Sequence, residues 1–289
     1  MLLVAVYQCT ICVLKLEGEK DAMRPICLTV QVIFLWIISI FTNLFVWIIS
    51  FSYFCSQLYM TKILFLHGFY ASGQCVPAVA LREAFERPRE RPRVGALAGM
   101  GERSLGIGRA NVLTPDLPLH PADAISLIRD ICDREKPDVL VGNSCGAFYA
   151  QMIAPIIGVP ALLGNPHFKM SDFLRERIGS HQYKSPRANG IQVFTIDEQL
   201  IREFEELEAH QFDCCNTYHK DKVWGLFGDE DTLAHFEPLF LEHYLYSYHF
   251  PGGHTPTAEQ FKTWYVPLIE KLVMEHPVQE GRRHVQSRS

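Results

Sequence analysis

The sequence predicts an α/β protein in which a mostly parallel sheet is flanked by helices. Short apolar runs alternate with longer amphipathic ones along residues 60–274, which is the order typical of βαβ units. One of these runs, DVLVG at 138–142, leads through a glycine-rich serine turn directly into a long apolar segment. Residues able to do chemistry follow other apolar runs, at the carboxyl edge where open α/β sheets build their sites.

Six apolar runs are expected to form strands, because each is short and rich in aliphatic or aromatic residues. In chain order they are KILFL (62–66), ANVLTP (110–115), DVLVG (138–142), VPALLG (159–164), KVWGLFG (222–228) and LYSYHF (245–250).

Three helices are expected between these strands. Residues 121–135 begin with a proline suited to a first helical turn and place Ala124, Leu127, Ile128 and Ile131 on one face. Residues 147–157 follow the serine turn, and residues 198–210 form a charged amphipathic helix. The interval 167–221 is too long for a simple connection, so we expect it to form a helical cap over the site.

The composition narrows the class of protein. Apolar residues make up 48% of the chain and charged residues 20%, which supports a packed core. The formal charge of −5 and the lack of a lysine or arginine block argue against nucleic acid as a partner. Nine cysteines show no disulfide framework or paired metal-ligand spacing, so we expect a reducing, cytoplasmic location and no metal or organic cofactor.

Residues 1–59 form a hydrophobic N-terminal extension with two interpretations. Its segment 28–55 is apolar and long enough to span a bilayer, which would make the protein membrane-anchored. The alternative is a start at Met60, with residues 1–59 as mis-assigned upstream sequence. We favour the alternative because the strand at 62–66 follows almost without a linker. The basic residues that precede the segment would also place the rest of the chain outside the cytoplasm.

Two other segments stand apart from the alternating pattern. Residues 87–109 are rich in proline, glycine and arginine and are expected to form an inserted surface loop. Residues 275–289 are expected to be a disordered tail.

The pentapeptide at 142–146 spells G-x-S-x-G around Ser144. A serine needs a base and a rigid exposed position to act as a nucleophile, and this motif supplies the position between a strand and a helix. A plain glycine turn is the alternative. The flanking strand and helix favour the nucleophile elbow, in which Gly142 and Gly146 permit the sharp turn.

An acid and a base are expected to follow the serine in the order Asp or Glu, then His. The acidic run at 229–231 ends a predicted strand, and Asp231 is the expected acid because the chain must first clear the strand end. Asp229 and Glu230 suit a solvated turn. His254 follows a predicted strand and a Pro-Gly-Gly break, which makes it the expected base.

Backbone donors for an oxyanion are expected where glycine allows close approach. The first strand is followed by His67 and Gly68, so the amides of Phe69 and Cys145 are the expected donors. No phosphate-binding glycine motif occurs there. Other residues expected near the pocket are His67, Gly68, Tyr70, Asn143 and His167.

These motifs together resemble the α/β-hydrolases, and specifically the small YqiA-like esterases. The resemblance rests on ILFLHGFYAS, PDLP, GNSCGAFYAQ, GNPHF, GDED and PGGHTPT, and it covers residues 60 to about 274. It implies an α/β-hydrolase fold and a carboxylester or thioester hydrolase with Ser144 as nucleophile, His254 as base and Asp231 as orienting acid. The insertion at 87–109 and the segment at 28–55 depart from the family.

The expected substrate is a small-molecule acyl ester or thioester. An acyl thioesterase or acyltransferase with the same three residues is the nearest alternative function. A non-catalytic, membrane-tethered binding protein on the same scaffold is a more distant one. Cys145 lies next to the serine, but the middle residue of the elbow points into the pocket, and that residue is Ser144.

Overall fold

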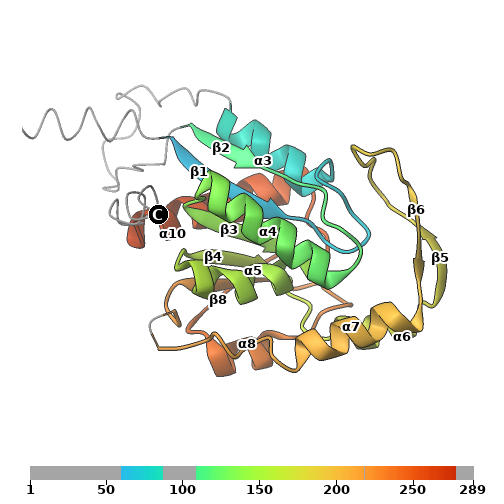
Figure 1. Ribbon diagram of the computed structural model, residues 1–289. Coiled ribbons are helices and arrows are strands. Elements are labelled where there is room, and N and C mark those ends of the chain that lie inside the picture. The colour runs from blue at the N-terminus through green and yellow to red at the C-terminus, as the bar shows by residue number, and fades with distance from the viewer. Residues whose placement is uncertain (1–59, 87–108, 218, 278–289) are drawn as a thin grey trace, which may run out of the picture. The chain divides into compact units, whose positions relative to one another are not determined.

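The computed structural model describes residues 60–86, 109–217 and 219–277, all within the unit that begins at Met60. A central sheet contains the strands β1 (Thr61–Leu66), β2 (Ala110–Leu113), β3 (Val139–Asn143), β4 (Ala161–Gly164), β7 (Val223–Gly228) and β8 (Tyr246–Phe250). All neighbouring pairs are parallel, in the order β2-β1-β3-β4-β7-β8 (Figure 1). The predicted parallel sheet is confirmed, and each predicted strand overlaps one of these six.

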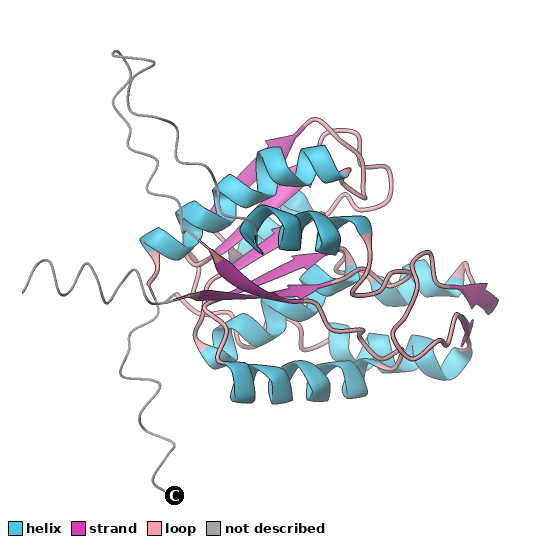
Figure 2. Ribbon diagram, turned by 90° about the horizontal axis from the view of Figure 1, so that it is seen from above, coloured by secondary structure: helices cyan, strands magenta, loops and turns pink. Residues whose placement is uncertain are grey.

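Helices cover both faces of this sheet (Figure 2). The helical elements are α3 (Val76–Glu86), α4 (Pro121–Glu135), α5 (Cys145–Ile157), α8 (Glu237–His243), α9 (Ala258–Gln260), a π-helical segment η1 (Phe261–Tyr265) and α10 (Val266–Glu275). Helices α4 and α5 share one core with one face of the sheet, whereas α3 and α10 share the core on the opposite face.

Strand β1 shows why its sequence is a continuous apolar run. Ile63 and Phe65 pack into the core beneath α3 and α10, while Leu64 and Leu66 pack into the core beneath α4 and α5. Side chains of a strand alternate between faces, so a strand buried on both faces needs apolar residues at every position.

The cap at 167–221 contains α6 (Met170–Arg175), β5 (Gly179–Gln182), β6 (Val193–Ile196) and α7 (Glu198–Glu208). The cap contains helices, as expected, and in addition β5 and β6 form a separate antiparallel pair away from the main sheet (Figure 1). The β5 sequence, GSHQ, contains no aliphatic residue, so no apolar run marks this strand in the sequence.

Several predictions concern residues outside the described ranges. They include the hydrophobic segment 28–55, the rest of residues 1–59, the insertion at 87–108 and the tail from 278 onward. Within residues 60–86, 109–217 and 219–277, no helix is both long enough and apolar enough to cross a membrane. The membrane anchor, the start at Met60 and the cytoplasmic location stay predictions.

Candidate active site

The residues predicted to act in catalysis lie where strands of the main sheet end. Ser144 follows β3, Asp231 follows β7, His254 follows β8, and Gly68 follows β1. Because all these strands are parallel, their carboxyl ends meet at one edge of the sheet. Residues far apart in the sequence thus reach a common site.

Ser144 occupies a backbone conformation that non-glycine residues rarely adopt, with φ 56° and ψ −121°. A β-carbon on Gly142 would lie 2.4 Å from the carbonyl oxygen of Gly146, and one on Gly146 would lie 2.0 Å from the carbonyl oxygen of Leu66. Both glycines are therefore required for α5 to pack this closely on β1 and β3. The strained turn exposes the serine at its apex, as a nucleophile elbow requires.

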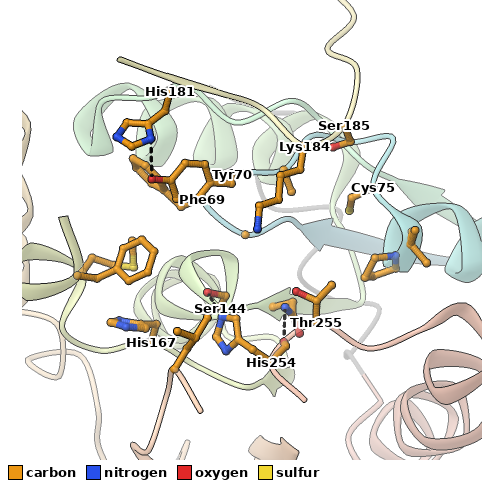
Figure 3. A pocket seen from close by; sticks show the side chains of 18 of the residues that line it. Phe69, Tyr70, Cys75, Ser144, His167, His181, Lys184, Ser185, His254 and Thr255 are labelled. Carbon is orange, nitrogen blue, oxygen red and sulfur yellow. Dashed lines mark hydrogen bonds between the residues drawn. The ribbon is translucent and has the colours of Figure 1, made fainter. Parts of the chain in front are cut away.

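Two hydrogen bonds connect Ser144, His254 and Asp231. The Nε2 of His254 lies 2.8 Å from the Oγ of Ser144 (Figure 3). The Nδ1 of His254 lies 2.8 Å from the Oδ2 of Asp231. An ionised carboxylate only accepts hydrogen bonds, so Nδ1 carries the proton and Nε2 accepts from the serine hydroxyl. This tautomer is the one in which the imidazole can take the serine proton.

The Asp231 carboxylate is held in its charged form. Its side chain is 3% exposed, and burial alone would raise its pKa, but the hydrogen bond and charge of His254 oppose this. The N–H groups of Leu233 and Ala234 also donate to Oδ1, at 2.8 and 3.1 Å. Together these interactions lower the pKa of Asp231 below its usual value.

The predicted oxyanion donors lie on either side of the serine. Cys145 begins α5, so its N–H has no partner within the helix. A β-carbon on Gly68 would lie 3.4 Å from the Cβ of Ser144, which puts the start of the Gly68–Phe69 loop against Ser144. In the described part of the chain, the N–H groups of Phe69 and Cys145 donate no hydrogen bond to the protein. Both are therefore available to a bound oxygen.

A cavity of about 710 Å³ opens beside Ser144. The wall includes four residues that the sequence places near the pocket: Gly68, Tyr70, Asn143 and His167. The rest comes mainly from the loop after β1 and from the cap (Figure 3). The cap therefore forms part of the wall of the site.

His67 does not line this cavity, in contrast to the sequence-based expectation. Its ring is 3% exposed, its Nε2 accepts from the N–H of Leu117 at 2.9 Å, and its Nδ1 donates to the carbonyl of Gly68 at 2.8 Å. Burial lowers the pKa of His67 to about 4, so the ring is neutral. His67 therefore joins the loop after β1 to the loop after β2.

Asn165, which follows β4, was not singled out from the sequence. Its Nδ2 donates to the carbonyl oxygens of Gly253 and His254 at 3.0 and 2.9 Å, and its Oδ1 accepts from the N–H of Gly228 at 2.7 Å. The side chain is fully buried. Its position directly after a strand, at the edge where the site forms, was the signal available in the sequence.

A metal centre is not evident in the described ranges, where no group of three or more His, Cys, Asp or Glu side chains could hold an ion. The chemistry available to Ser144, His254 and Asp231 is proton transfer coupled to nucleophilic attack.

Comparison with known proteins identifies the family. Residues 63–261 match the model of the alpha/beta hydrolase family, and the chain belongs to this family. The fold is similar to that of Est1E from Butyrivibrio proteoclasticus, with a TM-score of 0.52, 15% identity, and 74% of this chain and 89% of that chain covered.

Two other solved structures are similar in fold. The esterase domain of a Rhodothermus marinus protein has a TM-score of 0.51 and 15% identity, with 75% of this chain and 87% of that one covered. Mouse alpha/beta hydrolase domain-containing protein 10 has a TM-score of 0.50 and 13% identity, with 74% and 90% covered. At these identities the similarity concerns the fold. The α/β-hydrolase fold expected from the sequence is confirmed, and the family supports hydrolase activity.

Proposed function

We propose that this chain is a serine esterase that cleaves carboxylic esters through an acyl-enzyme intermediate. The observation that supports this best is the line of two 2.8 Å hydrogen bonds from Ser144 through His254 to Asp231. The esterases among the proteins of similar fold are consistent with it. The motif combination further favours a place among the small YqiA-like esterases.

In the first step, Ser144 Oγ bonds to the ester carbonyl carbon while its proton passes to His254 Nε2. The amides of Phe69 and Cys145 hydrogen-bond the oxyanion that develops, and Asp231 stabilises the charged imidazolium. The bond between the carbonyl carbon and the alcohol oxygen then breaks, and the alcohol leaves with the proton from His254. Water attacks the acyl-enzyme in the same way and releases the carboxylic acid and the free serine.

The thiol of Cys145 is poorly suited to replace the serine. It is buried, and burial raises the pKa of Cys145 to about 12, so the thiol stays protonated near neutral pH. The proposal therefore assigns the nucleophile to Ser144 and only the backbone amide of Cys145 to the site.

The test uses the purified full-length protein with p-nitrophenyl esters of increasing acyl length and a matched thioester series. Ser144→Ala is expected to lower kcat by about 10⁴-fold or more, because attack on the carbonyl loses its nucleophile. Ser180→Ala, an exposed serine in β5, is the control and should keep full activity.

A fluorophosphonate probe should label the native protein and Ser180→Ala but not Ser144→Ala. Equal activity of Ser144→Ala and the native protein, with both folded, would overturn the proposal. The thioester series separates the esterase from the thioesterase with the same three residues.

A further inference from the structure

The charged side chains that line the cavity beside Ser144 are all cationic. Arg177 and Lys184, both from the cap, are part of its wall, and no aspartate or glutamate is among the described lining residues. This contrasts with the formal charge of −5 of the whole chain. A concave site lined by charge of one sign concentrates the electrostatic potential and attracts ligands of the opposite sign.

Lys184 is held in place through its backbone. Its N–H donates to the carbonyl oxygen of Tyr70 at 2.8 Å, and the Ser72 hydroxyl donates to the carbonyl oxygen of Pro186 at 2.7 Å. These bonds attach the cap segment around Lys184 to the loop after β1, which also carries the amide of Phe69. The lysine therefore has a defined place relative to the nucleophile.

The ammonium group of Lys184 has no acidic partner within the described ranges. Its Nζ lies 5.7 Å from the centre of the Tyr70 ring. Among the described residues, the only other interaction of Lys184 is the bond from its backbone N–H to the Tyr70 carbonyl oxygen. Figure 3 shows this side chain extending from the cap into the cavity, on the side that faces Ser144. The cation is thus available to pair with a group on a bound molecule.

Arg177 adds positive charge but is already engaged. Its Nη1 donates to the carbonyl oxygen of Phe173 at 2.7 Å and lies 3.1 Å from the carboxylate of Glu176, which is exposed to solvent. Its guanidinium also stacks on the Phe173 ring, 4.0 Å from the ring centre. The partial neutralisation by Glu176 leaves Lys184 as the stronger candidate for an ion pair with substrate.

The wall near Lys184 and Ser144 is otherwise largely apolar, with contributions from Phe69, Tyr70, Met170, Phe173 and Leu233. These side chains suit a hydrocarbon or aromatic portion of a ligand. A ligand that fills the cavity would then meet a nucleophile, an apolar surface and a cation.

We infer that the substrates of this site carry an anionic group, a carboxylate or a phosphate, that pairs with the ammonium of Lys184 while the ester carbonyl lies at Ser144. This inference rests on the proposed esterase function and names its substrate class. The negative charge can lie on the acyl part or on the alcohol part, and the experiment distinguishes the two.

The test compares pairs of esters in which a carboxylate of one member is replaced by its methyl ester in the other. For the acyl part, the 4-nitrophenyl monoester of adipic acid is compared with the corresponding methyl 4-nitrophenyl diester. For the alcohol part, 4-acetoxybenzoate is compared with its methyl ester. In at least one pair, the native protein should have a kcat/KM about fivefold higher for the charged member, the size of effect that an exposed ion pair gives.

Three substitutions at one position test the role of Lys184. Lys184→Met should abolish the preference for the charged ester, Lys184→Glu should reverse it, and Lys184→Arg should keep most of it. Lys169→Met is the matched control, because Lys169 is an exposed cap lysine that does not line the cavity, and it should leave the preference unchanged. Added salt should weaken the preference in the native protein but not in Lys184→Met.

Two results would overturn the inference while leaving the proposed function intact. One is equal kcat/KM for both members of both pairs, with Ser144→Ala still inactive. The other is an equal loss of preference in Lys184→Met and Lys169→Met, which would point to net charge and not to a site. Absence of hydrolysis of every neutral and charged ester would instead count against the proposed function.

Discussion

Asn165 and His254 are joined by a hydrogen bond of 2.9 Å, in which the side-chain amide of Asn165 donates to the backbone carbonyl of His254. The same side chain accepts from the N–H of Gly228, at the end of the strand that precedes Asp231. One buried amide therefore ties the end of β4 to the two loops that carry the proposed base and acid. Asn165 has φ 42°, a conformation that asparagine tolerates better than most residues.

Replacing Asn165 with glycine should lower kcat more than it changes KM. Glycine keeps the positive φ but removes the bonds to Gly253, His254 and Gly228, so the imidazole is less well placed toward Ser144. A displacement of about 1 Å can cost about a hundredfold in rate. The measurement is kcat and KM for a neutral p-nitrophenyl ester, with folding followed by circular dichroism.

A purely structural role for Asn165 makes a different prediction. The Asn165→Gly protein would then unfold more easily, but its folded fraction would keep the native kcat. That outcome would remove Asn165 from the residues that position the base.

Two glycines near Ser144 should respond differently to alanine. Gly146→Ala places a β-carbon 2.0 Å from the Leu66 carbonyl oxygen, so we expect a loss of about 3 kcal/mol or more in unfolding free energy. At Gly68 the nearest atom to an added β-carbon is the Ser144 Cβ at 3.4 Å, an ordinary contact. Gly68→Ala should therefore fold with near-native stability. It should lose kcat/KM because the methyl group lies 3.9 Å from the Ser144 Oγ.

Urea unfolding of both variants, together with activity assays, tests this contrast. Native stability of Gly146→Ala would show that α5 and β1 can separate without cost. Full activity of Gly68→Ala would show that the substrate does not approach the serine from the side of this loop.

The parts of the fold that could be predicted depend on patterns contained in single segments. Strands β1, β3, β4 and β7 are short apolar runs because they are buried on both faces of the sheet. The turn at Ser144 could be recognised because its glycines must occur at fixed spacing around the serine. By contrast, β5 (GSHQ) contains no apolar run, and in the cap β5 and β6 form a two-stranded sheet of their own.

The parts of the site that could not be predicted depend on contacts between distant segments. Asn165 donates hydrogen bonds to the backbone carbonyls of Gly253 and His254. Every residue has a backbone carbonyl, so the sequence of that loop does not indicate this contact. Lys184 is an exposed lysine whose proposed role depends on the cap, which brings it to the cavity. The place of His67 after β1 predicts a position in the pocket wall, but its ring is buried and accepts a hydrogen bond from the N–H of Leu117.

Asp231→Asn should lower kcat by about 10⁴-fold, because the amide no longer selects the imidazole tautomer whose Nε2 accepts the serine proton. Asp229→Asn is the matched control. Asp229 is exposed and pairs with His249 at 3.1 Å, away from Ser144, so activity should be retained. Similar kcat values for the two variants would contradict the role of Asp231.

The pKa of Asp231 also restricts the pH profile. Because this pKa lies below the usual value of 3.8, an acid limb of kcat/KM with its midpoint at or above pH 4 must come from another group. The stabilising effect of the Asp231 carboxylate on the fold is present above pH 3.8 and is lost only as the pH falls through the lowered pKa of Asp231.

His167 should make the protein less stable in mild acid. Burial, with a smaller contribution from His254, lowers the pKa of His167 from 6.5 to about 4. Between these values the unfolded chain binds more protons than the folded chain, so stability is full above pH 6.5 and declines as the pH falls toward 4. The loss between pH 7 and pH 5 amounts to about 2 kcal/mol for this one group.

His167→Phe should remove this contribution without harming the fold. The Nδ1 of His167 has no hydrogen-bond partner in the described structure, and the ring packs between Phe173 and Phe236, with centroid distances of 5.3 and 4.9 Å. A phenyl ring satisfies this apolar setting, so the unfolding free energy at pH 7 should be equal or higher.

Urea unfolding at pH 7 and pH 5 tests this prediction. Between these pH values, the unfolding free energy of His167→Phe should fall by about 2 kcal/mol less than that of the native protein. His210→Gln, an exposed control paired with Asp213, should show the native decrease. If His167→Phe also shows the native decrease, protons taken up by other groups account for the acid sensitivity, and His167 is not the group that titrates on unfolding.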